Sequence, residues 1–303
     1  MDNVCHTLVG AAFGEAGLKQ RTRFGHAALM MAANLPDLDV LVFATNVPSV
    51  AFRRGWTHGT MAQWLLPMAL TATLYAIDRV RPIRGGVGPV RVGPLLLLSY
   101  LGVLSHVALD GLNNYGVRFL MPFDQRWFYG DALFIVDPWL WLVLGMGVWL
   151  ARRGGGPRPA RRGVFLATAY IAAMCVAAQM ARGMVSDAWR AEHGAEPHGL
   201  MVGPVPLTPF RREVIVDAGD HYVTGTFTWL PIRVAFDPTV TPKNDRDPRA
   251  VRAREAAAVQ GFLVWSRFPY WTFSRTDRGV SVTVNDMRFA NRGSPFVQTV
   301  PVE

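Results

Sequence analysis

Five apolar runs, separated by arginine-rich or polar loops, dominate the first 183 residues. They occupy residues 25–45, 60–78, 94–112, 132–150 and 164–182. A helix of about 20 apolar residues crosses the hydrocarbon core of a bilayer, and within that core the backbone must satisfy its own hydrogen bonds. The runs therefore predict an α-helical integral membrane domain with about five membrane segments.

The first run is the least regular of the five. Asn34, Pro36, Asp37 and Asp39 interrupt it, and a proline disfavours helical geometry in the residue that precedes it. Irregular backbone at membrane depth is tolerated only where protein or water surrounds it. We expect this segment to be a broken or re-entrant helix, and four full spans plus one re-entrant segment is the alternative count.

The composition changes near residue 184. The later segments are rich in Val, Thr, Phe, Trp and Tyr, with partial alternation and turn residues between them, which is typical of β-strands. We expect a multi-span membrane domain over residues 1–183 and a small, mainly β domain outside the membrane over residues 184–303. The predicted strands are 212–217, 221–230, 261–273 and 279–289, and the predicted helix is 245–259.

The basic residues indicate membrane topology rather than nucleic-acid binding. The formal net charge is +9, but the arginines cluster in two loops, 79–91 and 152–162, that separate apolar runs. Positively charged loops are retained on the cytoplasmic side of the membrane. The loops 46–59 and 113–131, together with the β domain, are therefore expected on the extracytoplasmic side, and no nucleic-acid partner is expected.

His106 and Asp110 lie four residues apart near the end of the third apolar run. On a helix this spacing places both side chains on one face. A charged residue at the centre of a membrane helix costs at least about 2.5 kcal/mol, so such residues usually face an interior site or one another. We interpret the two residues as a metal-ligand pair, with an orienting role of Asp110 on His106 as the alternative.

Further histidines and carboxylates fall at the same membrane level in this topology. Asp37 and Asp39 stand just after Pro36, where an ordinary turn is the alternative interpretation. His58 just precedes the second apolar run, where the alternative is a simple interfacial residue. The predicted metal ligands are His6, Asp37, Asp39, His58, His106 and Asp110. Additional candidates, as ligands or as partners of ligands, are Asp2, Asp124, Asp131 and Asp137.

A helix is also predicted over residues 2–17. Asp2, His6, Gly10 and Gly14 recur every four residues, and small residues allow membrane helices to pack closely. The functional interpretation is a tightly packed helix that brings His6 to the site. The alternative is an amphipathic start with a solvent-exposed histidine.

The combination of imidazole and carboxylate ligands suits zinc, manganese or iron, and the number of carboxylates allows one or two ions. A divalent ion of this kind activates water and stabilises charge on a phosphoryl or carbonyl oxygen. The expected chemistry is hydrolysis. Asp39 is our candidate catalytic residue, as a general base.

These motifs resemble the YdjM-like bacterial membrane-bound metal-dependent hydrolases over about residues 1–140. The residues that carry the resemblance are His6, Leu35-Pro36-Asp37-Leu38-Asp39, Thr57-His58-Gly59, His106 to Asp110, Tyr115-Gly116 and Pro122-Phe123. The resemblance implies a multi-span inner-membrane protein with His/Asp metal ligands. It also implies a distant likeness to zinc-dependent phospholipases, which places zinc before manganese and iron. The chain departs from the pattern by the insertion of Trp56 before Thr57.

The function expected from residues and resemblance together is a membrane-bound metal-dependent hydrolase. Its substrate is expected to be an ester or phosphoester bond in a membrane lipid or another amphipathic molecule. Two alternatives remain open: a proton- or cation-coupled transporter that uses the same acids and histidines, and a non-catalytic membrane interaction protein. The oligomeric state is left open.

Overall fold

The computed structural model describes residues 1–45, 47, 49–81, 88–276, 279–292 and 297–302. The chain divides into two compact units. The first consists of Met1–Leu41 and Arg54–Ala177, and the second of Val42–Arg53 and Ala178–Glu303. The predicted domain boundary after residue 183 stays a prediction. Residues 82–87 of the first basic loop lie outside the described residues.

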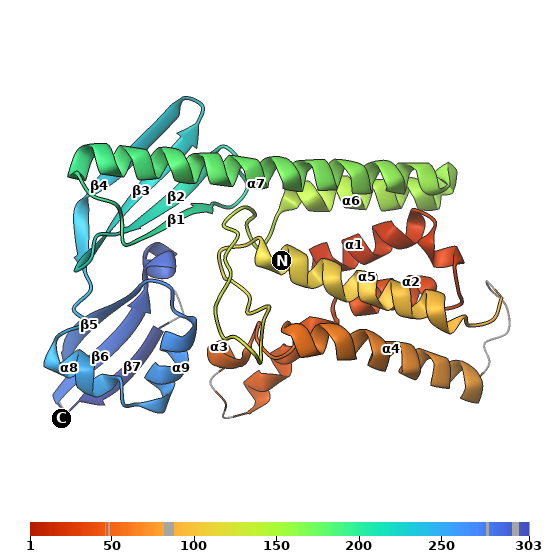
Figure 1. Cartoon of the computed structure of the whole chain (residues 1–303), viewed down its shortest axis with the longest axis horizontal. Helices are drawn as coiled ribbons and strands as arrows, with labels where there is room; N and C mark the ends of the chain where they lie inside the picture. Colours follow the sequence, from red (N-terminus) through yellow and green to blue (C-terminus); the bar gives the residue numbers. More distant parts are fainter. Residues whose placement is uncertain (46, 48, 82–87, 277–278, 293–296, 303) are drawn as a thin grey trace. The chain divides into compact units, whose positions relative to one another are not determined.

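The first unit is built from helices (Figure 1). In chain order these are α1 (Asn3–Glu15), η1 (Leu18–Gln20), α2 (Gly25–Ala32), η2 (Leu35–Ala44), α4 (Thr60–Val80), α5 (Val92–Gly111), α6 (Pro138–Leu150), η3 (Ala151–Gly155) and α7 (Pro157–His193). Helix η2 ends within the second unit, and α7 continues into it.

Among the described residues, two helices are long and apolar enough to cross a membrane: α5 and α7. A third candidate span is α2 with η2, which are bent by 49° relative to each other, so the expectation of a broken first segment is confirmed. The expected count of about five spans is not supported. Helix α6, for example, has only 13 residues and is about 20 Å long, short of the roughly 30 Å of a bilayer core.

The two long helices differ in their surroundings. In the apolar stretch of α5, 44% of the residues are buried inside the protein, whereas the figure for α7 is 17%. Large apolar side chains such as Phe165 and Val176 are exposed along α7. Lipid is the solvent that accommodates such side chains, so α5 is the central helix of the unit and α7 presents a lipid-compatible surface.

Helix α2 lies between α1 and α5 in close contact with both, because glycines face it from either side. A Cβ atom on Gly10 of α1 would lie 2.7 Å from the carbonyl oxygen of Leu29. A Cβ atom on Gly102 of α5 would lie 2.5 Å from the Cβ atom of Ala32. The glycine-mediated packing expected of α1 is therefore confirmed at Gly10, and Gly102 holds the carboxyl-terminal half of α5 against the end of α2.

The second unit contains two antiparallel sheets among its described residues, with strand orders β1-β2-β3-β4 and β5-β6-β7. The strands are β1 (Gly199–Pro204), β2 (Arg211–Asp217), β3 (His221–Trp229), β4 (Ile232–Pro242), β5 (Pro269–Thr276), β6 (Gly279–Asp286) and β7 (Val297–Val302). Short helices accompany them: α3 (Ser49–Phe52), α8 (Pro248–Ala253), α9 (Ala257–Trp265) and η4 (Met287–Arg292). The expected small, mainly β region is confirmed.

The prediction of a strand over 261–273 is wrong in its first half. Residues up to Trp265 belong to α9, which buries Val259, Phe262 and Trp265 at a spacing of three, as one face of a helix requires. The single helix predicted over 245–259 is instead α8 followed by the start of α9. An apolar run this short does not distinguish a helix from a strand by its pattern.

A buried ion pair at the end of β6 is hydrogen-bonded to the segment before β5. The side chains of Asp286 and Arg288 are both fully buried, and Asp286 also accepts hydrogen bonds from Ser266 Oγ (2.7 Å) and the Arg267 backbone N–H (2.8 Å). Burial raises the pKa of the Asp286 carboxyl, but Arg288 and the hydrogen bonds outweigh burial and hold that pKa below its usual value of 3.8.

We expect Gly102→Ala to lower the stability of the first unit by about 1 to 3 kcal/mol, because the added methyl group overlaps the backbone and side chain of α2. Thermal unfolding of the purified protein measures this change. The matched control is Gly93→Ala in the same helix, where a Cβ atom has nothing within 4 Å and alanine is the better helix former. Equal unfolding temperatures for the two variants would contradict the proposed packing.

Asp286 provides a prediction about pH. A carboxyl with a lowered pKa in the folded state stabilises that state above its unfolded pKa, about 4, and this stability is lost as the pH falls. Asp286→Asn is expected to cost about 3 to 5 kcal/mol at neutral pH, because Arg288 remains buried without its partner. It is also expected to flatten the loss of stability between about pH 5 and about pH 3. Tryptophan fluorescence during thermal unfolding measures both effects, and identical slopes in the two proteins would refute this role.

Candidate metal centre

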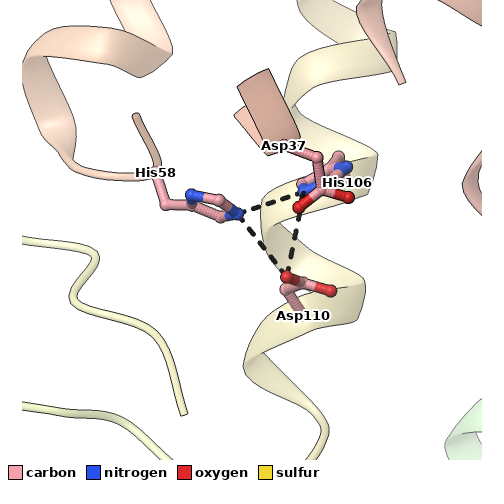
Figure 2. A group of neighbouring side chains, drawn as sticks. All are labelled: Asp37, His58, His106 and Asp110. Carbon is pink, nitrogen blue, oxygen red and sulfur yellow. Dashed lines mark hydrogen bonds and ion pairs between the residues drawn. The ribbon is translucent and has the colours of Figure 1, made fainter. Parts of the chain in front are cut away.

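Four side chains from three separate segments of the first unit converge on one point. Ligand atoms of Asp37, His58, His106 and Asp110 all lie within 4.8 Å of one another. Figure 2 shows the four side chains turned toward each other, with His106 and Asp110 on successive turns of α5. The i, i+4 pair predicted from the sequence is thus joined by a carboxylate from η2 and by an imidazole from the loop before α4.

Three of these donors form a tight triangle. The Nε2 atoms of His58 and His106 are 3.1 Å apart, and Asp110 Oδ2 lies 3.5 Å from His58 Nε2 and 3.8 Å from His106 Nε2. Ligands of a tetrahedral zinc ion, at about 2.0 to 2.2 Å from the metal, lie roughly 3.3 to 3.6 Å apart. The spacing of the triangle therefore fits a single ion of that size.

Asp37 completes the group from its more accessible side. Its Oδ1 atom lies 3.8 Å from His106 Nε2, and its side chain is 11% exposed, whereas the His106 side chain is fully buried. Helix η2 is a 3₁₀ helix, in which successive residues turn by about 120°. Asp37 and Asp39, two residues apart, therefore point in different directions, and only Asp37 joins the cluster.

The orientation of His106 depends on the break between α2 and η2. Its Nδ1 atom lies 2.7 Å from the carbonyl oxygen of Ala33, and a carbonyl oxygen can only accept a hydrogen bond, so Nδ1 carries the proton. The backbone N–H of Asp37 bonds to Asn34 instead of Ala33, which leaves the Ala33 carbonyl available. The Nε2 lone pair of neutral His106 then faces the centre, as metal-ligating histidines require.

His58 is oriented by a second relay. Its Nδ1 atom lies 2.9 Å from Thr57 Oγ1, which donates its own hydrogen to Asp39 Oδ2 at 3.2 Å. Because the threonine hydroxyl has one hydrogen, His58 Nδ1 is the donor in this pair. The neutral ring again directs its Nε2 lone pair to the centre, and the insertion of Trp56 has not displaced His58 from the site.

The donor set fits a cation by its own chemistry. Two imidazole lone pairs 3.1 Å apart repel each other unless a positive charge lies between them. The buried Oδ2 atom of Asp110 has the Arg54 guanidinium at 3.2 Å but, among the described residues, no donor in hydrogen-bond geometry, so it keeps capacity to bind a cation. A divalent ion would satisfy both the lone pairs and this oxygen, so the cluster is a candidate metal centre.

His6, a predicted ligand, lies beside the cluster rather than within the group of four. Its ring stacks on His106 at 3.8 Å between centroids, and its Nε2 atom is 3.2 Å from Asp110 Oδ1. The amino group of Met1 also contacts Asp110 Oδ1. His6 therefore contacts the site at Asp110 Oδ1, whereas the triangle uses the other oxygen, Oδ2.

The remaining predicted carboxylates have other local contacts. Asp2 and Asp137 cap the amino-terminal ends of α1 and α6 by accepting backbone hydrogen bonds. Asp124 bonds to the backbone and side chain of Arg126. Asp131 adopts a left-handed backbone conformation. An Asp directly before a helical run is a recognised signal of helix capping. Capping accounts for the presence of Asp2 and Asp137 without a role at the metal.

Arg54 also belongs to the site, although its sequence context does not mark it as a site residue. Its Nη2 atom lies 3.2 Å from Asp110 Oδ2, its Nη1 atom donates to Asn113 Oδ1 at 2.9 Å, and its backbone N–H donates to Asp39 at 2.8 Å. The sequence offered one signal for Arg54. It lies four residues before His58, in a loop that the positive-inside rule assigns to the outer side, where arginines are less common. Arg54 links the candidate ligand Asp110 to the relay that orients His58.

Residues 1–185, more than half of the chain, match the model of the family described as YdjM inner membrane protein. The chain belongs to the YdjM inner membrane protein family. The resemblance drawn from the sequence motifs is confirmed, and with the apolar helices it supports an inner-membrane protein.

A relative in Bacillus subtilis (strain 168), "Uncharacterized protein YfhP", is 22% identical over 318 residues, which cover 100% of this chain and 91% of that protein. No solved structure matches the chain. Family membership and the cluster together support a membrane protein with a possible metal site formed by Asp37, His58, His106 and Asp110.

Elemental analysis of detergent-purified protein tests the centre. We expect bound metal in the wild type and its near-complete loss in His106→Ala and Asp110→Ala, because each removes one corner of the triangle. Asp39→Asn should weaken metal affinity only by about 10- to 100-fold, as loss of a partner of a ligand does. His221→Ala in the second unit is the control and should retain all the metal. Wild-type metal content in folded His106→Ala would refute the assignment.

Proposed function

We propose that the protein is a membrane-bound metal-dependent hydrolase that cleaves an ester or phosphoester bond in a membrane lipid or another amphipathic substrate. The observation that carries the proposal is the triangle of His58, His106 and Asp110. Its two imidazole Nε2 atoms lie 3.1 Å apart and are both directed inward by protonated Nδ1 atoms. We infer a divalent ion, zinc first and manganese or iron as alternatives.

Asp37, His58, His106 and Asp110 would hold the ion. When bound, a divalent ion of this class activates water and stabilises negative charge on a phosphoryl or carbonyl oxygen. Asp37 has the most exposed side chain of the four. It marks the side from which water and substrate would enter. The buried remainder of the group keeps the donors in fixed positions, as catalytic preorganisation requires.

Asp39 as a general base stays a prediction. Its Oδ2 atom accepts hydrogen bonds from the backbone N–H of Arg54 (2.8 Å) and from Thr57 Oγ1 (3.2 Å), and it lies 3.6 Å from His58 Nδ1. These contacts favour a positioning role, in which Asp39 fixes the tautomer and direction of His58.

Arg54 favours a phosphoester over a carboxylic ester. Its guanidinium lies 3.2 Å from Asp110 Oδ2 and therefore places a permanent positive charge at the edge of the donor triangle. A guanidinium matches the planar, multidentate geometry of phosphate oxygens. During hydrolysis of a phosphoester this charge would stabilise the negative charge on the phosphoryl group.

An apolar cavity on the other side of α5 supports a substrate with a hydrocarbon chain. It has a volume of about 230 Å³ and lies between α1, α5, α6 and α7, with Ser105, Ala108 and Leu109 among its lining residues. The Ser105 hydroxyl bonds to its own helix at Gly102, so the lining is apolar in effect. Ser105 and Leu109 lie on the same turns of α5 as His106 and Asp110 but on a different face of the helix, and we infer that an acyl chain would occupy this cavity while its ester group reaches the donors.

We further propose that the centre and the carboxyl-terminal β region lie on the extracytoplasmic side. The support is the clustering of arginines in the loops 79–91 and 152–162, which the positive-inside rule assigns to the cytoplasm. His106 and Asp110 stand at the opposite end of α5 from Arg91, which precedes that helix.

Hydrolysis assays with detergent-purified, metal-loaded protein test the proposed function. We expect cleavage of dioctanoyl phosphatidic acid or dioctanoyl phosphatidylglycerol by the wild type, and a loss of at least about 100-fold in Asp110→Ala, because a ligand carboxylate is missing. His221→Ala should retain the wild-type rate. Metal-loaded wild type that cleaves none of the phosphoesters, nor p-nitrophenyl butyrate as a carboxylic ester, would refute a hydrolase.

Ala108→Trp examines the substrate class in the same assay. The indole would fill the apolar cavity without contact with the donors, so the rate on dioctanoyl lipids should fall by about tenfold or more, since burial of each lost methylene is worth about 0.8 kcal/mol. Hydrolysis of p-nitrophenyl phosphate, which has no acyl chain, should stay at the wild-type rate. Equal losses on both substrates would argue against an acyl chain in this cavity.

A further inference from the structure

A second cavity lies at the far end of α1 from the metal centre. It has a volume of about 500 Å³ and is lined by the end of α1, by η1 and by the start of α7. Glu15, at its edge, lies about 14 Å along the α1 axis from His6. The cavity is therefore separate from the donors of the metal centre, and its residues have no part in the proposed hydrolysis.

The lining of this cavity is basic. Lys19, Arg21 and Arg161 contribute three positive charges, and Glu15 contributes one negative charge. Both oxygens of Glu15 are engaged, one by Lys19 and the other by Arg152 Nε at 3.0 Å. The acid is thus neutralised within the protein, and the positive charge of Arg21 and Arg161 remains for a ligand.

Backbone contacts hold the side chain of Arg161 and the main chain of Arg21 at the cavity. Arg161 Nε donates to the carbonyl oxygen of Ala16 at 2.9 Å, and its Nη2 atom lies 3.4 Å from the place of a Cβ atom on Gly17. Gly17 has a φ of +119°, which only glycine adopts without strain. The backbone of Arg21 is held in turn by Arg91, whose Nε atom donates to the Arg21 carbonyl at 2.9 Å.

Helix α7 adds a further preference for a negative charge. Gly156 and Pro157, at its amino-terminal end, also line the cavity. The amino-terminal end of a helix carries a partial positive charge, and α7 has 37 residues. Two arginines and the positive end of a long helix thus face one polar cavity at the level where the arginine-rich loops meet the membrane helices.

We propose that this cavity binds a phosphate group, supplied by the headgroup of an anionic phospholipid. Basic pockets between membrane helices at the level of the headgroups are the sites at which proteins bind such lipids. Arginine provides several donors in a planar fork that matches phosphate oxygens. The volume exceeds that of a phosphate ion alone and accommodates a glycerophosphate headgroup, while the acyl chains would extend along the apolar surfaces of the neighbouring helices.

Titration of the full-length, detergent-purified protein with dioctanoyl phosphatidylglycerol tests the proposal by isothermal calorimetry, with all proteins carrying Asp110→Ala and no added metal so that the lipid is not hydrolysed at the metal centre. Dioctanoyl phosphatidylcholine and inorganic phosphate are the comparison ligands. We expect the anionic lipid to bind at least tenfold more tightly than either, since only this lipid combines a net negative phosphate with acyl chains. Inorganic phosphate that binds as tightly as the lipid would overturn the assignment to a lipid.

The double variant Arg21→Gln, Arg161→Gln should bind dioctanoyl phosphatidylglycerol at least tenfold more weakly than the Asp110→Ala parent. The matched control is Arg158→Gln, Arg162→Gln, which removes the same charge from the same region outside the lining of the cavity, and it should bind like the parent. If the double variant does not fold, Arg21→Gln alone leaves the bond from Arg161 to Ala16 in place. Equal binding by the Arg21 variant and the control pair would overturn the proposal.

Discussion

The candidate metal centre depends on one hydrogen bond at a break in a helix, the 2.7 Å bond from His106 Nδ1 to the carbonyl oxygen of Ala33. In a continuous helix that carbonyl would accept from the backbone four residues later. The break before Pro36 frees it. Close packing at Gly102 then brings His106 within reach, so a proline in one segment and a glycine in another together determine which nitrogen of the imidazole faces the centre.

Charge balance is the second constraint on this site. Asp110 is fully buried, and its Oδ2 atom lies near three nitrogen atoms: Arg54 Nη2, His58 Nε2 and His106 Nε2, at 3.2, 3.5 and 3.8 Å. Arg54 supplies one permanent positive charge, but the two inward-facing imidazole lone pairs still lack a cation. A metal ion would satisfy all of these groups at once, whereas their burial without one is costly.

Much of the centre was predictable because its signals are local. The spacing of His106 and Asp110, the proline before Asp37 and the helical stripe that contains Gly10 are all visible in the sequence. Arg54 was not predictable, because its role arises from contacts with Asp110 and Asn113, more than 50 positions away. The count of membrane spans also failed. Apolar composition alone does not reveal that α6 ends after 13 residues.

The sequence by itself determined the break in the first apolar segment and which ionisable side chains lie within apolar segments, because these properties follow from neighbouring residues. Only the tertiary structure decided which donors meet. Asp37 and Asp39 are equivalent in the sequence, yet the 120° turn per residue of a 3₁₀ helix directs one to the imidazoles and the other to Thr57. His6 likewise reaches Asp110 but stacks on His106 rather than joining the triangle. Convergence depends on distances between segments remote in the chain, and packing alone sets those distances.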